Sequence, residues 1–168
     1  TVDLLLKKNY IVRVIDDFSG GHKKNLIHHK NNKDLVILKK NILSISSNHT
    51  IFKNVDYLFH YAGKGDIVPS IDNPKKYFKN NVFGTLNILE ACRKNNIKKI
   101  IYAASSSCYG IARTPTEETN PIQNLYPYAL SKYQGEQLVL HFSKVYDLKF
   151  ISLRIFNAYG TRVRTTGV

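Results

Sequence analysis

Tyr128 and Lys132 are the residues whose types and spacing could do chemistry together. They lie four positions apart in a stretch that is typical of the start of a helix, so both side chains would lie on one face. An ammonium beside a phenol favours the phenolate and lowers its pKa, which would make Tyr128 a general acid/base. The same pair also suits an ordinary solvated helix surface, and the spacing alone does not separate these two interpretations.

The serines 105–107 form a second group of candidate side chains. They follow the apolar run 99–103, so their hydroxyls would stand just past the end of a buried strand. Serines after a strand are often plain loop residues. Their place, one strand and one loop before Tyr128, makes them candidates for the same site.

Asp16 ends the apolar run 11–15 and is a candidate cofactor ligand. In dinucleotide-binding folds an acidic residue at such a strand end binds the adenine ribose, about 20 residues after a Gly-rich phosphate-binding turn. Counting back from Asp16 leads past residue 1, so we expect that turn to precede this chain. A carboxylate would repel the 2′-phosphate of NADP, which favours NAD. An Asp here is also a common turn or cap residue.

Short apolar runs alternate with longer amphipathic stretches along the chain. Near-continuous apolar runs are typical of strands that are buried on both faces of a parallel sheet; they occur at 11–15, 35–38, 57–60, 99–103 and 150–155. Helices are expected at 78–95, with the stripe Val82, Leu86 and Leu89, and at 127–146, with the stripe Leu138, Phe142 and Val145. This alternation predicts an α/β fold with a Rossmann-like doubly wound parallel sheet, incomplete because its first strand is expected before residue 1.

Composition limits the class of protein. The 168 residues, 43% of them hydrophobic, suit one globular domain, and no apolar run approaches the roughly 20 residues that cross a bilayer. Cys92 and Cys108 lack metal-ligand spacing, so we expect free thiols, no metal and a cytoplasmic location. The net charge of +13 comes from scattered lysines without an aromatic platform, which indicates surface charge rather than nucleic-acid binding. That charge would attract an acidic substrate such as a sugar nucleotide.

Taken in order, these features resemble the extended short-chain dehydrogenase/reductase family, and within it the nucleotide-sugar epimerases and dehydratases of the UDP-glucose 4-epimerase type. The resemblance covers almost the whole chain. It rests on seven motifs in family order, at residues 14–21, 60–63, 81–91, 105–110, 115–118, 128–132 and 154–160.

The resemblance implies three catalytic residues. Tyr128 would be the acid/base, Lys132 would lower its pKa and hold the nicotinamide ribose, and Ser105 would bind the reacting sugar hydroxyl. Asn81 would tie the central helix to the active-site strands. The NAD-binding residues implied by the resemblance are Asp16, Asp17, Phe18, Asn41, Ile42, Tyr61, Ala62, Gly63, Asn81, Tyr128, Lys132 and Phe156. The substrate-binding residues implied are Ser105, Ser107, Tyr128 and Asn157.

Two departures from the family pattern bear on function. Asn41 stands where the family often has an acidic residue near the adenine, so an amide would replace a carboxylate at that contact. Ser106 and Ser107 follow Ser105, where a dehydratase would have an Asp-Glu pair. We therefore expect NAD-dependent epimerisation of a nucleotide sugar through a transient 4-keto sugar. The alternatives are a dehydratase or reductase of the same family, or a non-catalytic NAD-binding protein.

The resemblance also implies how the whole protein is organised. Residues 1–168 would be a partial NAD-binding Rossmann domain, and residues 158–168 would begin a truncated substrate-binding region. We expect the full-length protein to be a homodimer that acts on a nucleotide sugar and binds neither nucleic acid nor membrane.

Overall fold

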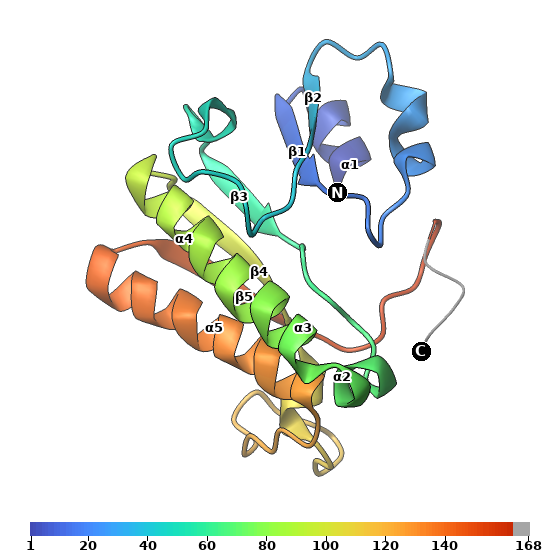
Figure 1. Ribbon diagram of the computed structural model, residues 1–168, viewed down its shortest axis with the longest axis vertical. Helices are drawn as coiled ribbons and strands as arrows, with labels where there is room; N and C mark the ends of the chain where they lie inside the picture. The colour runs from blue at the N-terminus through green and yellow to red at the C-terminus, as the bar shows by residue number, and fades with distance from the viewer. Residues whose placement is uncertain (163–168) are drawn as a thin grey trace. The chain divides into compact units, whose positions relative to one another are not determined.

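The computed structural model describes residues 1–162 and divides the chain into two compact units, Thr1–Ile45 and Ser46–Val168 (Figure 1). Each unit has its own parallel sheet. The expected α/β, Rossmann-like fold of parallel strands joined by helices is confirmed. Within the expected substrate-binding segment 158–168, residues 163–168 lie outside the described residues.

Unit 1 is built around two parallel strands. Its elements are α1 (Val2–Lys7), β1 (Val12–Asp16), the 3₁₀ helix η1 (Lys23–His29) and β2 (Leu35–Lys39). The strands pair in register from Val12 with Leu35 to Asp16 with Lys39, so both end at the same edge. A small apolar core lies around them, formed by Leu6, Val12, Ile42 and Ile45.

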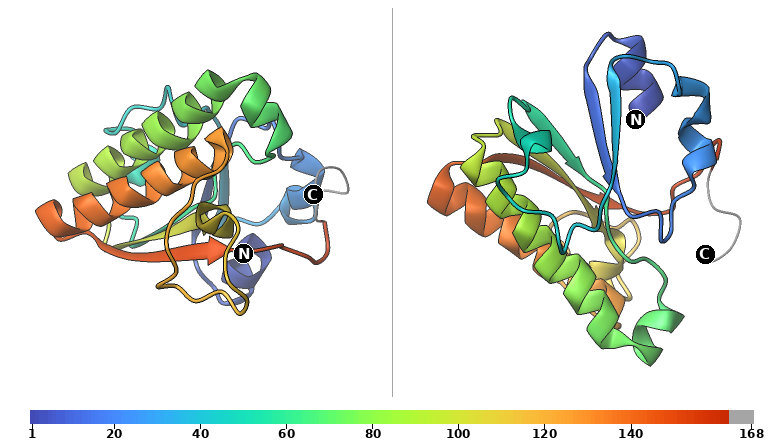
Figure 2. Two further views of the ribbon diagram at one scale, coloured as in Figure 1. Left: turned by 90° about the horizontal axis from the view of Figure 1, so that it is seen from below. Right: turned by 45° about the horizontal axis from the view of Figure 1, so that its top comes forward.

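Unit 2 contains a three-stranded parallel sheet in the order β3-β4-β5. Its strands are β3 (Tyr57–His60), β4 (Lys99–Ser105) and β5 (Lys149–Ile155), and its longest helices are α4 (Gly84–Lys94) and α5 (Pro127–Tyr146). The shorter elements are η2 (Thr50–Phe52), α2 (Val68–Asp72), α3 (Pro74–Phe78), the π-helical turn η3 (Lys79–Phe83) and η4 (Ser106–Tyr109). Helices α4 and α5 lie side by side along one face of the sheet (Figure 2).

The burial of the strands corrects part of the expectation. Burial on both faces holds for β4, where Ile100 and Ile101 are both buried, but it is wrong for β2, β3 and β5. In β2 and β3 the exposed apolar side chains are Val36, Ile37, Tyr57 and Phe59. Along β5 the side chains alternate, and Ile151 and Leu153 are exposed. The physical reason in unit 2 is that β3 and β5 are edge strands and the helices lie on only one face of the sheet (Figure 2). In unit 1 the sheet has only two strands, so β2 is an edge strand as well.

The predicted apolar stripe of α5 is also wrong in part. Phe142 is buried, but Val145 is 54% exposed, in the last turn of the helix. The buried face also carries the polar side chains of Ser131, Lys132 and Glu136, which a search for apolar periodicity passes over. None of the helices in residues 1–162 combines the length and the apolar character that crossing a bilayer requires.

Candidate functional site

Tyr128 and Ser105 are brought together by the fold of unit 2. Ser105 is the last residue of β4, is almost fully buried, and accepts a hydrogen bond from the Ser107 N–H at 3.2 Å. Tyr128 stands in the first turn of α5, and its phenol donates to Ser105 Oγ at 3.3 Å. Two of the predicted catalytic groups thus form a hydrogen-bonded pair at the carboxyl end of the central strand.

The main chain of Tyr128 is held by Ser70, a residue that the sequence analysis missed. Ser70 is fully buried in α2, and its Oγ accepts the Tyr128 N–H at 3.1 Å while donating to the Ile67 carbonyl at 2.5 Å. Helix starts leave backbone N–H groups that need an acceptor. The one signal in the sequence was that Tyr126, the N-cap residue of α5, has no capping side chain.

The ring of Tyr128 has a second neighbour that the sequence did not reveal. Tyr77 of α3 lies edge-on to it, with ring centroids 6.4 Å apart and an interplanar angle of 76°. Tyr77 is itself fixed, because its hydroxyl donates to the Gly65 carbonyl at 2.5 Å. The phenol of Tyr128 is therefore positioned by packing as well as by hydrogen bonds.

Lys132 lies one turn after Tyr128 and is buried, with its Nζ 4.5 Å from the ring centroid of Tyr102. Burial lowers the pKa of Lys132 to about 8, although the nearby charge of Glu136 raises it. Within residues 1–162, Lys132 Nζ makes no hydrogen bond to a protein group. A Cβ at Gly63 would stand 3.6 Å from this Nζ, so the glycine keeps the space beside the ammonium open.

Asn81 ties the segment after β3 to α5. It lies in the π-helical turn η3, a type of turn that often occurs at functional sites. Its Oδ1 accepts the Lys64 N–H at 2.7 Å, and its Nδ2 donates to the Lys64 carbonyl and to Ser131 Oγ, both at 3.0 Å. Asn81 is buried and both of its amide atoms are engaged, so it positions Gly63 and α5 as a support.

His60, the last residue of β3, is buried and is linked to Asn81 through a hydrogen-bond network. Its Nε2 lies 2.9 Å from Thr85 Oγ1, and that hydroxyl donates its one hydrogen to the Asn81 carbonyl at 2.6 Å. His60 must therefore donate from Nε2. Burial, and then the charge of Lys132, lower the pKa of His60 to about 3, so the imidazole is neutral at neutral pH.

A partly buried ion pair joins α5 to the end of β5. Arg154 Nε donates to the carboxylate of Glu136 at 3.1 Å, and Arg154 Nη1 donates to the Tyr109 hydroxyl at 2.7 Å. Ser152 Oγ also donates to Glu136, at 2.7 Å. These contacts fix the segment that follows Ser105 and the strand that leads to Phe156.

The other predicted residues of unit 2 follow the ends of its strands. Because β3, β4 and β5 are parallel, their carboxyl ends share the edge where ligands bind in open α/β sheets. Tyr61 and Gly63 are exposed and Ala62 is half-buried just after β3, and Ser107 is half-buried after β4. Phe156 and Asn157 are exposed directly after β5.

In unit 1 the predicted residues gather at the carboxyl ends of β1 and β2. Asp16 Oδ1 accepts the Phe18 N–H at 2.7 Å, so Asp16 closes a turn, and a Cβ at Gly21 would stand 2.9 Å from its Oδ2. Asp17 Oδ2 accepts the Asn41 amide at 2.7 Å. Ile42, the next residue, is buried.

Comparison with known proteins shows which family the chain resembles. The sequence profile of the NAD dependent epimerase/dehydratase family matches residues 1–168. A Methanocaldococcus jannaschii protein provisionally named a UDP-glucose 4-epimerase is 35% identical over 96% of the chain and 52% of the relative. The UDP-glucose 4-epimerase of Lacticaseibacillus casei is 33% identical over 95% of the chain and 48% of the relative. The chain thus spans about half the length of the curated relatives it matches.

Solved structures give the same result. The UDP-N-acetylglucosamine 4-epimerase of Methanobrevibacter ruminantium, in complex with UDP-N-acetylmuramic acid, matches with a TM-score of 0.90 and 34% identity over 96% of this chain and 51% of that one. The Thermus thermophilus UDP-glucose 4-epimerase in complex with NAD matches with a TM-score of 0.86 and 27% identity over 99% of this chain and 53% of that one. The family match over the whole length, with these relatives, shows that the chain belongs to the NAD dependent epimerase/dehydratase family.

Proposed function

We propose that the protein carrying this chain is an NAD-dependent nucleotide-sugar epimerase that inverts C4 of a UDP-glucose or UDP-galactose type substrate through a transient 4-keto sugar. The observation that carries the proposal is the hydrogen bond of Tyr128 to Ser105, one helical turn from the buried ammonium of Lys132. The relatives named as 4-epimerases support the same reaction.

The residues present fit NAD. Lys132 Nζ has donors free of protein hydrogen bonds within residues 1–162, and Gly63 leaves room beside it, which suits the hydroxyls of a ribose. Asp16 would accept hydrogen bonds from the adenine ribose hydroxyls at the end of β1. When bound, NAD supplies the acceptor and donor of hydride for epimerisation.

The chain's own residues handle the proton. Tyr128, as the phenolate, would take the proton from the sugar 4-hydroxyl and later return it. Ser105 Oγ, now 3.3 Å from the phenol oxygen, would bind the same hydroxyl and hold it in line with Tyr128. Lys132, one helical turn along α5, would bind the nicotinamide ribose beside this phenol.

The remaining assignments belong to this proposal. Ser107 and Asn157 would contact the substrate with Ser105 and Tyr128. Further contacts to NAD would come from Asp17, Phe18, Asn41, Ile42, Tyr61, Ala62 and Phe156, with Asn81 as a support. Residues 1–168 would form part of the NAD-binding domain, residues 158–168 would begin the substrate-binding region, and the whole protein would be a cytoplasmic homodimer.

A product assay tests the proposal. The protein expressed from the complete reading frame that encodes this chain is incubated separately with UDP-glucose, UDP-galactose and their N-acetylated and uronic acid counterparts, and the sugars are identified by NMR. We expect a mixture of both C4 epimers from either member of one pair, without net formation of NADH. A 4-keto-6-deoxy product would indicate a dehydratase instead, and unchanged sugars in every incubation would overturn the proposal.

A further inference from the structure

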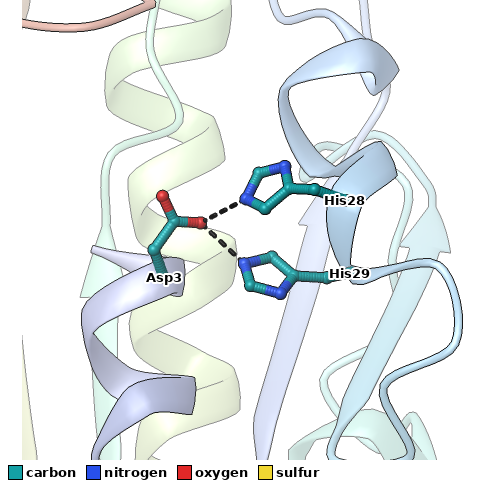
Figure 3. Close-up of side chains that lie close together, drawn as sticks. All are labelled: Asp3, His28 and His29. Atoms are coloured by element: carbon teal, nitrogen blue, oxygen red, sulfur yellow. Dashed lines mark hydrogen bonds and ion pairs between the residues drawn. The ribbon is translucent and has the colours of Figure 1, made fainter.

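Three ligand-type side chains converge in unit 1, in a cluster that the proposed reaction does not use. Asp3 of α1 faces His28 and His29 of η1, and Figure 3 shows both imidazole rings directed at the same carboxylate. The Nε2 atoms of His28 and His29 lie 3.0 Å and 2.7 Å from Asp3 Oδ1. One ligand atom from each residue lies within 4.8 Å of the other two.

The spacing of these atoms matches a transition-metal site. A tetrahedral zinc ion bound at about 2.0–2.1 Å by nitrogen and oxygen places neighbouring ligand atoms about 3.3 Å apart. The observed separations of 3.0 Å and 2.7 Å are shorter than this by about 0.3 Å and 0.6 Å, a difference that small side-chain rotations would remove. Each Nε2 must carry a hydrogen to contact a carboxylate oxygen, and a metal ion would take the place of both hydrogens.

The side chains of the cluster are partly exposed, so solvent could reach an ion bound there. The side chains of Asp3 and His28 are 41% and 45% exposed, while that of His29 is 17% exposed. Water can therefore reach the fourth coordination position, as in zinc sites with three protein ligands. The ligands come from two elements, so an ion would join α1 to η1 across about 25 residues of chain.

The ligand atoms, and not the overall charge of the chain, decide which ions suit the cluster. The chain carries a net charge of +13, so general electrostatics repels cations, and binding has to come from coordination. Two imidazoles and one carboxylate suit Zn²⁺, Co²⁺ or Ni²⁺, whereas Mg²⁺ and Ca²⁺ require several oxygen ligands. The geometry points to a site for one divalent transition-metal ion at Asp3, His28 and His29, which clamps α1 to η1 and stabilises unit 1.

Calorimetry with the untagged, chelator-treated protein expressed from the complete reading frame tests this inference independently of enzyme activity. We expect one Zn²⁺ per chain, no heat from Mg²⁺ or Ca²⁺, and a melting temperature that rises with Zn²⁺ concentration. Mutating a residue that only hydrogen-bonds to a metal ligand typically lowers metal affinity about 10–100-fold. His29 and Asp3 would be ligands themselves, so His29→Gln and Asp3→Asn should each weaken binding by at least about tenfold. His22→Gln is the matched control, because His22 is exposed just before η1 and outside the cluster.

The outcomes separate a metal site from a plain ion pair. Co²⁺ added to the wild type should give the visible absorption of a four-coordinate site, and His28→Gln should remove it. If Asp3→Asn fails to fold, the exposed His28 keeps the test decisive, with circular dichroism as the check on folding. Absence of saturable Zn²⁺ binding, or equal loss of binding in His22→Gln and His29→Gln, would overturn the inference.

Discussion

The phenol of Tyr128 donates a hydrogen bond to Ser105 Oγ at 3.3 Å. The backbone N–H of the same tyrosine is held by Ser70 at 3.1 Å. Serines from β4 and α2 therefore fix the two ends of Tyr128, so the position of its reactive oxygen depends on residues far away in the sequence.

Ser70→Ala should lower both stability and turnover. The change leaves the Tyr128 N–H without its acceptor, which costs about 1–3 kcal/mol when the group is buried. We expect a fall in kcat with KM nearly unchanged, and partial rescue by Ser70→Thr, which restores a hydroxyl. Ser46→Ala, at an exposed serine of the same unit, is the control for thermal melting and kinetics. Wild-type melting and kcat in Ser70→Ala would show that the contact does not position Tyr128.

Lys132→Met should remove the change in activity that the wild type shows around pH 8. Burial lowers the pKa of Lys132 to about 8, so the wild type loses this ammonium as the pH rises through that value, whereas the variant has no charge to lose. The methionine keeps an unbranched side chain that can pack against Tyr102. The measurement is kcat against pH, with Lys144→Met in α5 as an exposed control. A profile identical to that of the wild type would remove Lys132 from the acid/base role.

Asp16→Ser should reduce the preference for NAD over NADP. The serine can still accept the turn hydrogen bond from Phe18, so the change mainly removes the carboxylate. A lost hydrogen bond to a charged group corresponds to about 1.5–3 kcal/mol, or roughly 10–100-fold in NAD affinity. Calorimetric titration of both cofactors checks this, with Asp34→Ser as the control in unit 1. Tighter binding of NADP than of NAD by the wild type would contradict the assignment.

His60 should make the unfolding free energy fall as the pH is lowered. Its pKa is about 3 in the folded chain and about 6.5 in the unfolded chain, so between these values only the unfolded chain binds the proton. This contribution is full above about pH 6.5 and decreases by up to about 1.4 kcal/mol per pH unit below it. His60→Gln keeps an N–H that can donate to Thr85 but does not titrate.

Urea unfolding at about pH 7, 6 and 5 compares the two proteins. The stability advantage of the wild type over His60→Gln should shrink as the pH falls. A difference that stays constant over this range would mean that His60 is not held neutral by burial.

The elements that follow local patterns could be predicted from the sequence. Proline at the first position of a helix marks the start of α5 at Pro127, and the apolar runs predicted the five strands. The π-helical turn at 79–83 could not be predicted, because one wider turn leaves no periodic signal in the stretch read as a single helix.

The contacts that support the site could not be predicted from the sequence, because they join residues far apart in the chain. Ser70 and Tyr128 are 58 residues apart, and a hydrogen bond between them depends on the packing of α2 against the start of α5. Lys132 was predicted from its spacing to Tyr128, but its burial beside Tyr102 depends on how α5 packs on β4.

Turnover of the Tyr128→Phe enzyme tests the central claim most directly. The phenylalanine keeps the ring that packs edge-on against Tyr77 and removes only the phenol oxygen. Acid/base groups contribute about 10²–10⁴-fold, so kcat for C4 epimerisation should fall by that factor while KM stays close to the wild-type value. Tyr126→Phe, two residues earlier, should be unaffected. A Tyr128→Phe enzyme that epimerises at the wild-type rate would contradict the account.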